Sequence, residues 1–509
     1  MNMVTNQTAT AKRLQTLFEN VVCERATEHN PEITGLSLDS RSIAVGELFC
    51  AVKGHSVDGR QFILAAISRG ATAVVADASD DFDFSSVPND IPLVLVKNLG
   101  RTLSLIAGNF YDHPSRSVRV IGVTGTNGKT TCVQLLMQLF NQLGEKAASI
   151  GTMGYGFSQS TLQDFGLTTP DAIACQRVLA QLRNAGATFV AMEVSSHALE
   201  QGRVDAVNFE GAVFTNISRD HLDYHGTFEH YIAAKSSLFT FDALRFAVIN
   251  GDDSASRALS AASTAESSFL YGAESGNTVV AKDIALSPEG VAAKISSAWG
   301  EANIQSCLIG NFNILNLLAV ITTACAAGYS LPAVAEQVQH LQPARGRMQR
   351  IVVDGGDVTV CVDYAHTPDA LEKALLALRA QAANDVWVVF GCGGDRDKGK
   401  RAQMGRIAAE HADAVVVTSD NPRTETPACI IDDVLSGIPA SDKRVTNFED
   451  RSAAIEFAIL QAKSGDTVLI AGKGHEDYQI VGTAKRHFDD CEVSSQCLYA
   501  RISQQEVQR

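Results

Sequence analysis

The chain has 509 residues, 45% of them hydrophobic and 19% charged, and its 42 Lys and Arg against 57 Asp and Glu give a net charge of −15. This length exceeds what one hydrophobic core serves and indicates about three domains of roughly 100–200 residues each. The acidic balance argues against a non-specific nucleic-acid binder, because such a protein needs a broad basic surface that displaces counterions from phosphates. Any anionic ligand must therefore be held by local positive charge.

The eleven cysteines contain no Cys-x-x-Cys pair, and several lie in apolar runs. This pattern is typical of reduced core cysteines rather than of a disulfide framework or a thiolate metal site. No apolar stretch reaches the roughly 18 residues of a membrane-spanning helix, and residues 1–22 lack the apolar centre of a secretory signal. We therefore expect a cytoplasmic protein that does not insert into membranes.

Residues 1–105 form the first expected domain. Short apolar runs at 47–52, 71–76 and 91–96 alternate there with helical stretches. Apolar runs of this length separated by helical segments predict a small α/β domain.

Residues 106–343 form the second expected domain. Its apolar runs lie at 118–125, 189–195, 212–218 and 246–251. The long segments between these runs leave room for the helices that right-handed parallel crossovers require. The pattern predicts a central parallel sheet.

Residues 344–509 form the third expected domain, after a candidate hinge at 341–348 that contains Pro and Gly. Apolar runs at 386–394, 414–420 and 467–474 each end in glycine or polar residues. Ligands bind at such strand ends in an open parallel sheet. The whole chain is therefore predicted to be α/β, and the third domain to be Rossmann-like.

A phosphate-binding loop follows the first strand of the second domain. It consists of Gly125, Thr126, Asn127, Gly128, Lys129, Thr130 and Thr131. Backbone N–H groups of such a loop turn toward phosphate oxygens, the lysine reaches the β- and γ-phosphates, and the first threonine can ligate Mg²⁺. The longer standard pattern would need glycine where Val123 stands, so the match is to a G-x-x-G-K-T variant. An ordinary glycine-rich turn is the weaker interpretation.

Three further features point to metal or phosphate chemistry beside this loop. Glu193 ends an apolar strand, where its carboxylate can face the loop, although a solvated glutamate is the plain alternative. The segment 219–225, RDHLDYH, gathers charged and imidazole groups after another strand. Lys235 lies in a helix-like stretch where a surface lysine is the ordinary expectation.

Ten segments, in order over nearly the whole chain, resemble the motifs of the Mur ligases. They are GVTGTNGKTT, AMEVSSH, NISRDHLDYHGT, HYIAAKSSLF, GNFNILN, GRMQ, VDYAHTPDAL, FGCGGDRDKGKR, DNPRTE and AGKGHEDYQI. The resemblance implies a three-domain fold with a central P-loop ATPase domain. It also implies ATP-dependent addition of meso-2,6-diaminopimelate to the D-glutamate of UDP-N-acetylmuramoyl-L-alanyl-D-glutamate, through an acyl phosphate, in cytoplasmic peptidoglycan precursor synthesis. The three domains would then bind the UDP-sugar, ATP and the amino acid.

The resemblance also implies roles for individual residues. Lys129, Glu193, His221 and Lys235 would be catalytic, with Mg²⁺ held by Thr130, Glu193, His221 and Lys235, the last as a carbamate formed with CO₂. ATP would contact the loop and Asn313, Arg347 and Asp363. The UDP-sugar peptide would contact Leu38, Ser40, His55, Ser56, Val57, Thr168, Thr169, Ser195, Gln201 and Arg203. The family commonly has Asn where this chain has Leu167, so that polar contact is lost here.

The incoming amino acid would contact Arg396, Asp420, Asn421, Pro422, Arg423, Gly472 and Glu476. Diaminopimelate carries a second carboxylate that lysine lacks, and the planar guanidinium of Arg423 suits bidentate pairing with it. We therefore expect diaminopimelate to be preferred over L-lysine.

Three other interpretations stay open from the sequence. Two are related amide ligases, a lysine-adding relative and a folylpolyglutamate synthase, and AMEVSSH and DNPR speak against both. The third is a P-loop regulatory module without ligase chemistry, which would not need Lys235, the RDHLDYH segment and the C-terminal loops together. The expected partners are small molecules only, with no nucleic acid, and a monomer is expected.

Overall fold

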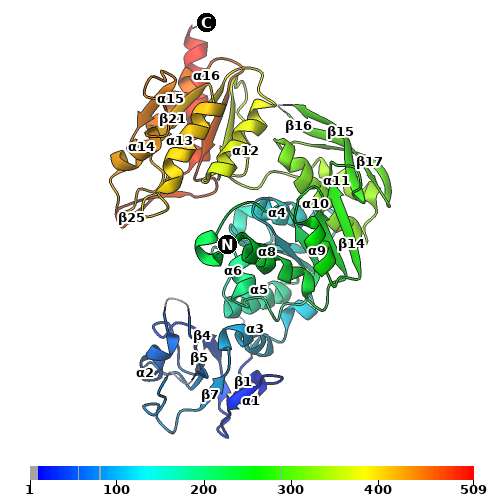
Figure 1. Ribbon diagram of the computed structural model, residues 1–509, viewed down its shortest axis with the longest axis vertical. Coiled ribbons are helices and arrows are strands. Elements are labelled where there is room, and N and C mark those ends of the chain that lie inside the picture. Colours follow the sequence, from blue (N-terminus) through cyan, green and yellow to red (C-terminus); the bar gives the residue numbers. More distant parts are fainter. Residues whose placement is uncertain (1–9, 55–56, 80–81, 288, 509) are drawn as a thin grey trace. The chain divides into compact units, whose positions relative to one another are not determined.

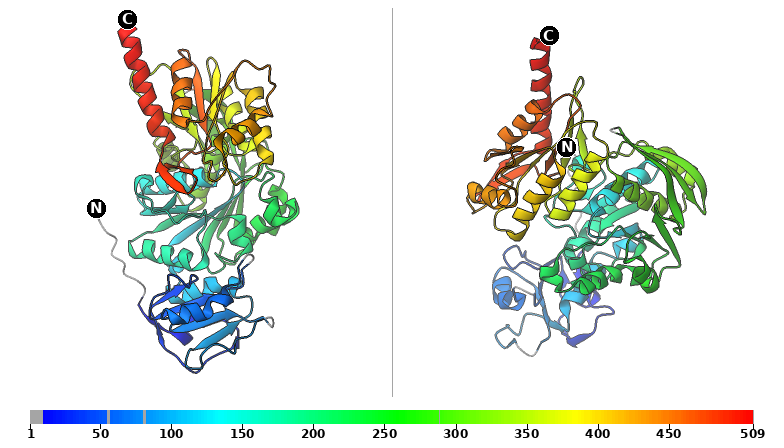
Figure 2. Two further views of the ribbon diagram at one scale, coloured as in Figure 1. Left: turned by 90° about the vertical axis from the view of Figure 1, so that its left-hand side faces the viewer. Right: turned by 45° about the horizontal axis from the view of Figure 1, so that its top comes forward.

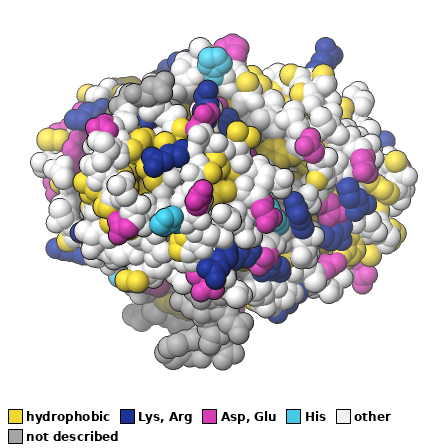
Figure 3. Space-filling model, turned by 90° about the horizontal axis from the view of Figure 1, so that it is seen from below, with side chains coloured by type: hydrophobic (Ala, Val, Ile, Leu, Met, Phe, Trp, Pro, Cys, Tyr) yellow, Lys and Arg dark blue, Asp and Glu magenta, His cyan; other side chains and the backbone are white. Residues whose placement is uncertain are grey.

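The computed structural model describes residues 10–54, 57–79, 82–287 and 289–508 (Figure 1). The chain divides into two compact units, Met1–Leu270 and Tyr271–Arg509. Within the described ranges, no helix combines the length and the apolar character needed to cross a membrane. On the face shown in Figure 3, Lys and Arg side chains are interspersed with Asp and Glu side chains.

The first unit begins with a five-stranded sheet. The strand order is β2 (Cys23–Arg25), β7 (Leu93–Val96), β6 (Ala73–Asp77), β5 (Glu47–Ala51) and β4 (Gly35–Ser37). All neighbours pair in parallel except β2 and β7. A separate antiparallel pair joins β1 (Lys12–Arg13) to β3 (Glu32–Ile33).

Both faces of this sheet are buried, as a parallel sheet requires. Leu48 and Val75 share a core with α1 (Leu14–Leu17) and α3 (Leu99–Phe110), whereas Phe49 and Val74 share another with α2 (Ile63–Ser68). The alternation of neighbouring residues between the two cores follows from the period of two along a strand. A small α/β fold therefore forms here as predicted.

The rest of the first unit is built on a second, mostly parallel sheet. Its strands run in the order β10 (Gly154–Gly156), β9 (Ala147–Gly151), β11 (Phe189–Glu193), β8 (Arg119–Thr124), β12 (Phe209–Phe214) and β13 (Phe246–Asn250). Only β10 is antiparallel to its neighbour among these. The helices are α4 (Lys129–Gln142), α5 (Ala172–Asn184), α6 (Ser196–Glu200), α7 (Leu222–His225), α8 (Phe228–Ser236) and α9 (Ser256–Ala262).

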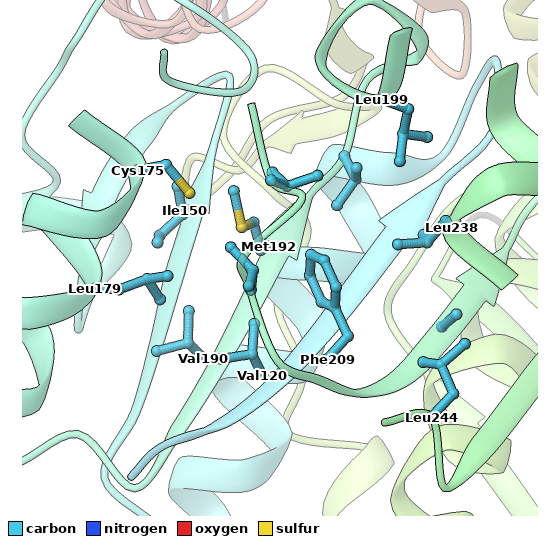
Figure 4. Packing of buried hydrophobic residues seen from close by; sticks show 14 of the residues in the cluster. Val120, Ile150, Cys175, Leu179, Val190, Met192, Leu199, Phe209, Leu238 and Leu244 are labelled. Atoms are coloured by element: carbon cyan, nitrogen blue, oxygen red, sulfur yellow. The ribbon is translucent and has the colours of Figure 1, made fainter. Parts of the chain in front are cut away.

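The core of this sheet explains where its strand ends lie. Figure 4 shows Val190 and Met192 of β11 on the same side as Cys175 and Leu179 of α5, and all four are buried in one cluster. On α4, Phe140 stacks on Phe189 with ring centroids 3.6 Å apart. Helices on both faces leave the carboxyl ends of the parallel strands as the accessible edge.

The second unit starts within β14 (Ser267–Gly272). An antiparallel meander follows, of β15 (Val279–Ser287), β16 (Gly290–Ser297) and β17 (Gly300–Ser306). Two helices come next, α10 (Asn311–Ala326) and α11 (Leu331–Val338).

A six-stranded sheet forms the rest of this unit. Its order is β18 (Gln349–Ile351), β19 (Thr359–Asp363), β23 (Thr467–Ala471), β20 (Val386–Phe390), β21 (Ala414–Thr418) and β22 (Val445–Phe448), and only β18 is antiparallel to its neighbour. Two layers of helices cover it (Figure 2). One layer holds α12 (Pro368–Arg379), α13 (Gly399–His411) and α14 (Pro427–Leu435), and the other holds α15 (Arg451–Gln461) and α16 (Asp490–Gln508). A hairpin of β24 (Tyr478–Val481) and β25 (Ala484–His487) follows β23.

The three strands predicted for the C-terminal region are therefore neighbours in one doubly covered sheet, in the order β23, β20 and β21. This arrangement brings the loops after Ala471, Phe390 and Thr418 to one edge. The predicted Rossmann-like organisation is confirmed.

A fully buried ion pair joins the two helices of one layer. Arg451 donates from Nε and Nη2 to the two carboxylate oxygens of Asp490 at 2.7 and 2.8 Å, and neither side chain is exposed. The same guanidinium donates to the Ala471 carbonyl at 2.9 Å, at the end of β23.

Replacing Asp490 with alanine is expected to lower the free energy of unfolding by about 3–5 kcal/mol, because a buried guanidinium loses its counter-charge. Asp369→Ala, which breaks the exposed pair with Lys373, should cost less than about 0.5 kcal/mol. Urea unfolding of the two variants measures both values. If Asp490→Ala and Asp369→Ala destabilised the protein equally, the buried Arg451–Asp490 pair would not have the stabilising role expected of it.

Candidate active site

The predicted phosphate loop connects β8 to α4. Gly128 caps the helix in a left-handed conformation, and Gly125 has φ +148°. A Cβ atom on Gly125 would lie 1.9 Å from Thr215 Oγ1, and that hydroxyl donates to the Asn127 carbonyl at 2.6 Å. The loop is therefore held against the end of β12 at a distance that only glycine allows.

Gly125→Ala is expected to lower ATP affinity at least about a hundredfold, because hydrogen bonds to charged phosphates contribute about 1.5–3 kcal/mol each and a displaced loop loses several. Gly144→Ala is the matched control, since Gly144 is also left-handed (φ +92°) but has no atom near its Cβ position. That variant should lose only about 1–2 kcal/mol of stability for the backbone conformation. Calorimetric titration with ATP distinguishes them, and unchanged affinity in Gly125→Ala would contradict a phosphate loop.

Two lysines converge on this loop. Lys129 Nζ donates to the carbonyls of Gly125 and Thr126 at 2.9 and 3.0 Å. Lys235 Nζ, from α8, donates to the same Gly125 carbonyl at 2.7 Å and is 2% exposed. Burial, together with the charge of Lys129, places the pKa of Lys235 well below that of an ordinary lysine. Lys235 is thus not the surface lysine that its helix alone suggests.

Glu193 is buried beside the start of α4. Its Oε2 accepts a hydrogen bond from Thr130 Oγ1 at 3.1 Å. Thr152 donates from its backbone N–H to Glu193 Oε1 at 2.8 Å and from its hydroxyl to Glu193 Oε2 at 3.2 Å. Register pairs Glu193 with Val123 of β8, so the carboxylate stands level with the loop. The alternative of a solvated strand-end glutamate is wrong.

The predicted sugar-peptide contacts continue this network. Thr152 Oγ1 lies at hydrogen-bond distance, 3.1 Å, from Thr168 Oγ1. Thr169 Oγ1 donates to the Glu193 carbonyl at 2.9 Å and lies 3.2 Å from Ser195 Oγ. Its own carbonyl accepts from Arg203 at 3.0 Å.

Arg203 is oriented in turn by Gln201, whose Oε1 accepts from Nε at 2.9 Å and from Nη2 at 2.6 Å. Gln201 donates to Tyr224 Oη at 3.0 Å. The structure thus brings together five of the predicted sugar-peptide residues with Thr130 and Glu193: Thr168, Thr169, Ser195, Gln201 and Arg203.

His221 lies in a cluster of rings. It is the N-cap residue that precedes α7 and has φ +53°, and its ring centroid is 4.8 Å from that of His197. His197 also lies 4.1 Å from Tyr224, while Tyr231 places its hydroxyl 3.1 Å from Thr126 Oγ1. His197, Tyr231 and Thr152 were missed from the sequence, although His197 stands within AMEVSSH and Tyr231 within HYIAAKSSLF.

The predicted uridine contacts lie in the five-stranded part of the first unit. Leu38 and Val57 are exposed, whereas Ser40 is buried. His55 and Ser56 fall outside the described residues. Leu167 is 47% exposed, so the apolar residue at this departure from the family pattern faces solvent.

The three remaining predicted ATP contacts lie in the second unit. Asn313 is buried in α10 and donates to the Ile309 carbonyl at 2.6 Å. The Arg347 guanidinium lies 4.6 Å from the ring centroid of Tyr364. Asp363 ends β19 and accepts from the backbone of Met348 and Ala365 at 2.7 and 2.8 Å. Burial raises the pKa of Asp363, and nearby Arg347 opposes that rise.

The predicted amino-acid contacts gather at the ends of β21 and β23. Asn421 donates to Glu476 Oε2 at 2.8 Å. Lys473, fully buried, donates to the same oxygen at 3.1 Å and to Asn421 Oδ1 at 3.4 Å. A Cβ on Gly472 (φ +118°) would lie 2.8 Å from an Asp420 carboxylate oxygen. Lys473 was missed, although it stands within AGKGHE.

The predicted cations of this region lie on adjoining loops. Arg423 follows Pro422 and donates from Nη1 to the carbonyls of Gly394 and Asn421 at 2.9 and 3.4 Å. Arg396 is exposed and donates to the Asp395 carbonyl at 3.3 Å. Within the described ranges, no group of three or more His, Cys, Asp or Glu side chains is placed to hold a metal ion.

Three family models match consecutive stretches of the chain. "Mur ligase family, catalytic domain" matches residues 32–111, "Mur ligase middle domain" residues 123–324, and "Mur ligase, glutamate ligase domain" residues 346–474.

A phosphate loop on a parallel sheet, joined to a buried carboxylate and accompanied by a Rossmann-like sheet, defines an α/β enzyme that uses a nucleoside triphosphate. UDP-N-acetylmuramoyl-L-alanyl-D-glutamate–2,6-diaminopimelate ligases of Chromobacterium violaceum and Pseudomonas aeruginosa are 46% and 47% identical to it, covering 92% of this chain and 94% and 95% of theirs. A solved structure of a ligase of that name matches with TM-score 0.71 and 36% identity, over 97% of this chain and 99% of that one. The chain belongs to the Mur ligase family.

Proposed function

We propose that the protein is the ATP-dependent ligase that joins meso-2,6-diaminopimelate to UDP-N-acetylmuramoyl-L-alanyl-D-glutamate. The names of the relatives support this substrate assignment. The structural observation that supports the ligase function most strongly is the hydrogen-bond network from Thr130 through Glu193 and Thr169 to Arg203. It links the phosphate loop to the residues assigned to the sugar peptide.

The proposed reaction has two steps. The terminal carboxylate of D-glutamate attacks the γ-phosphorus of ATP, which forms an acyl phosphate and releases ADP. The amine of the incoming amino acid then attacks the acyl carbon, loses a proton and expels phosphate, so that an amide results. Lys129 and the loop amides hold the transferred phosphate, while Arg203 orients the sugar peptide.

Magnesium fits the oxygen donors beside the loop. Mg²⁺ on a nucleotide prefers oxygen ligands and needs only one or two protein carboxylates. Thr130 Oγ1 and Glu193 Oε2 lie 3.1 Å apart and would hold it, and His221 would help to hold a second ion. When bound, the metal neutralises charge on the phosphates.

Lys235 is proposed to be carbamylated. Carbamate formation needs an uncharged amine, and the lowered pKa of Lys235 favours that form. The change also replaces a positive charge beside Lys129 with a negative one. Two ammonium groups that share the Gly125 carbonyl repel each other, whereas an ammonium and a carbamate attract.

The remaining assignments are carried to this chain as parts of the proposal. Leu38, Ser40, His55, Ser56 and Val57 bind the uridine diphosphate, and Asn313, Arg347 and Asp363 contact ATP. The amino acid is bound by Arg396, Asp420, Asn421, Pro422, Arg423, Gly472 and Glu476. The three family models, which match residues 32–111, 123–324 and 346–474, support three successive domains, and we place these at 1–105, 106–343 and 344–509.

Cell location and oligomeric state follow from the same proposal. ATP and UDP-linked precursors are handled in the cytoplasm, so the reaction takes place there. One chain carries every set of residues that the proposed reaction needs, so a monomer is sufficient for it and is part of the proposal. Its partners are these small molecules and not nucleic acid.

Nucleotide turnover in four mixtures tests the function. Purified protein with ATP is incubated alone, with the UDP-sugar dipeptide, with diaminopimelate, and with both, and ADP and phosphate are measured. We expect sustained release only with both substrates. Release independent of both would indicate a P-loop module without ligase chemistry, and a requirement for a folate in place of the sugar peptide would indicate a folylpolyglutamate synthase.

A further inference from the structure

The two loops that carry Arg396 and Arg423 are bound to each other by side chains that none of the assigned roles includes. The backbone N–H of Asp395 donates to Glu425 Oε1 at 2.6 Å. Thr424 donates to the Asp395 carboxylate from its backbone N–H at 3.1 Å and from its hydroxyl at 2.8 and 2.9 Å. Each loop therefore accepts hydrogen bonds from the other.

The backbone of both loops is strained where they meet. Asp395 has φ +54° and Arg423 has φ +52°, a region that non-glycine residues occupy at a cost and only when their surroundings enforce it. A Cβ on Gly394 would lie 1.9 Å from the Pro422 carbonyl oxygen. The loops are thus in direct backbone contact, and each arginine follows or occupies a strained position.

A buried arginine binds both loops at the point where they meet. Arg401 of α13 has no exposed surface and donates to the two carboxylate oxygens of Glu425 at 3.0 and 2.8 Å. It also donates to the Gly393 carbonyl at 3.2 Å and to Asp433 Oδ2 at 2.8 Å. Arg401 therefore holds the carboxylate of one loop and the backbone of the other.

We propose that Asp395, Thr424, Glu425 and Arg401 form a clasp that positions Arg396 and Arg423 and thereby determines amino-acid selectivity. None of the four is assigned a contact with substrate, so they are positioning residues. The inference rests on the proposed function, because the cations must face the second carboxylate of diaminopimelate.

The chemistry of Arg423 explains why positioning matters. Both hydrogen bonds of its guanidinium within the described residues leave from Nη1. Nε and Nη2 then stay available for a planar, bidentate carboxylate pair, whose strength depends on orientation. A loop that loses its clasp lets Arg423 sample other orientations, so the pair forms at a greater entropic cost. L-Lysine lacks that carboxylate, so its binding should not change when the clasp is lost.

Two substitutions that remove different interactions test the clasp. Glu425→Gln keeps the shape but removes the charge that Arg401 pairs with, and Thr424→Val removes only the hydroxyl donated to Asp395. In each we expect KM for diaminopimelate to rise about tenfold and the preference over L-lysine to fall by a similar factor. The kcat at saturation and the KM values for ATP and the UDP-sugar dipeptide should stay within about twofold.

Conservative variants supply the controls. Thr424→Ser retains the hydroxyl and should restore the wild-type KM, while Asp433→Asn alters the partner of Arg401 that lies outside both loops and should leave KM unchanged. Unchanged selectivity in Glu425→Gln and Thr424→Val overturns the clasp. A lower kcat together with higher KM values for all three substrates also overturns it, because this result would indicate a general structural defect. A wild-type protein that fails to use diaminopimelate overturns the proposed function, and the clasp with it. The wild-type reaction thus separates the two failures.

Discussion

Lys235→Ala is expected to reduce ligase turnover at least about a hundredfold, because the carbamate proposed beside the phosphate loop cannot form without the amine. The buried Nζ lies 2.7 Å from the Gly125 carbonyl, so the lost group lies beside the proposed phosphate loop. Overall folding should persist, since removing a desolvated amine also removes a burial cost. Initial rates of ADP release at saturating substrates measure the effect.

Short carboxylates provide the sharper test of the same residue. Acetate or propionate that enters the space of the missing side chain should restore part of the activity of Lys235→Ala and none of that of Lys235→Arg, where the space stays filled. Lys146→Ala, at an exposed lysine, is the matched control and should behave as wild type. If plain Lys235→Ala keeps its activity, the carbamate proposal is wrong.

Arg423→Ala is expected to lower kcat/KM for diaminopimelate about a hundredfold or more, because a charge-assisted bidentate pair contributes several kcal/mol in a desolvated site. The rate with L-lysine should change little, since that substrate has no carboxylate for the arginine to pair with. The selectivity, taken from rates with each amino acid alone, should therefore collapse.

The control for Arg423 is Arg406→Ala, which removes an exposed arginine from α13. It should leave both rates unchanged. An Arg423→Ala variant that loses activity equally with both amino acids would show that the arginine maintains the loop rather than recognising the carboxylate.

Local order along the chain was enough to predict the phosphate site. A strand, Gly125, Gly128, Lys129 and a helix follow one another directly, and Lys129 reaches the carbonyls of Gly125 and Thr126 only four and three residues away. Glu193 could be placed because a parallel strand ends at the same edge as its neighbour, and register then aligns it with Val123. The predicted α/β class is confirmed for the same reason.

Contacts between distant segments could not be predicted. Thr152 reaches Glu193 across 41 residues, Arg401 reaches Glu425 across 24, and Lys473 reaches Asn421 across 52. These pairings depend on how strand ends come together, which no local pattern encodes. The burial of Lys235 is a similar case, because its helix suggests exposure and only tertiary packing buries the side chain.

Strand ends were also less certain than strand positions. The apolar run predicted at 467–474 is a strand only over Thr467–Ala471, and that at 414–420 only over Ala414–Thr418. The residues beyond these ends are glycine, polar or charged, and they no longer pair with the neighbouring strands. They turn into the loops that hold Gly472 and Asp420, where the proposed binding groups lie.

The most direct test is the mass of the product formed from UDP-N-acetylmuramoyl-L-alanyl-D-glutamate and ATP when diaminopimelate and L-lysine are offered at equal concentration. We predict a single UDP-linked tripeptide that carries diaminopimelate, formed with one ADP per molecule. A product that carries lysine, or ADP release without any tripeptide, would contradict the proposed function.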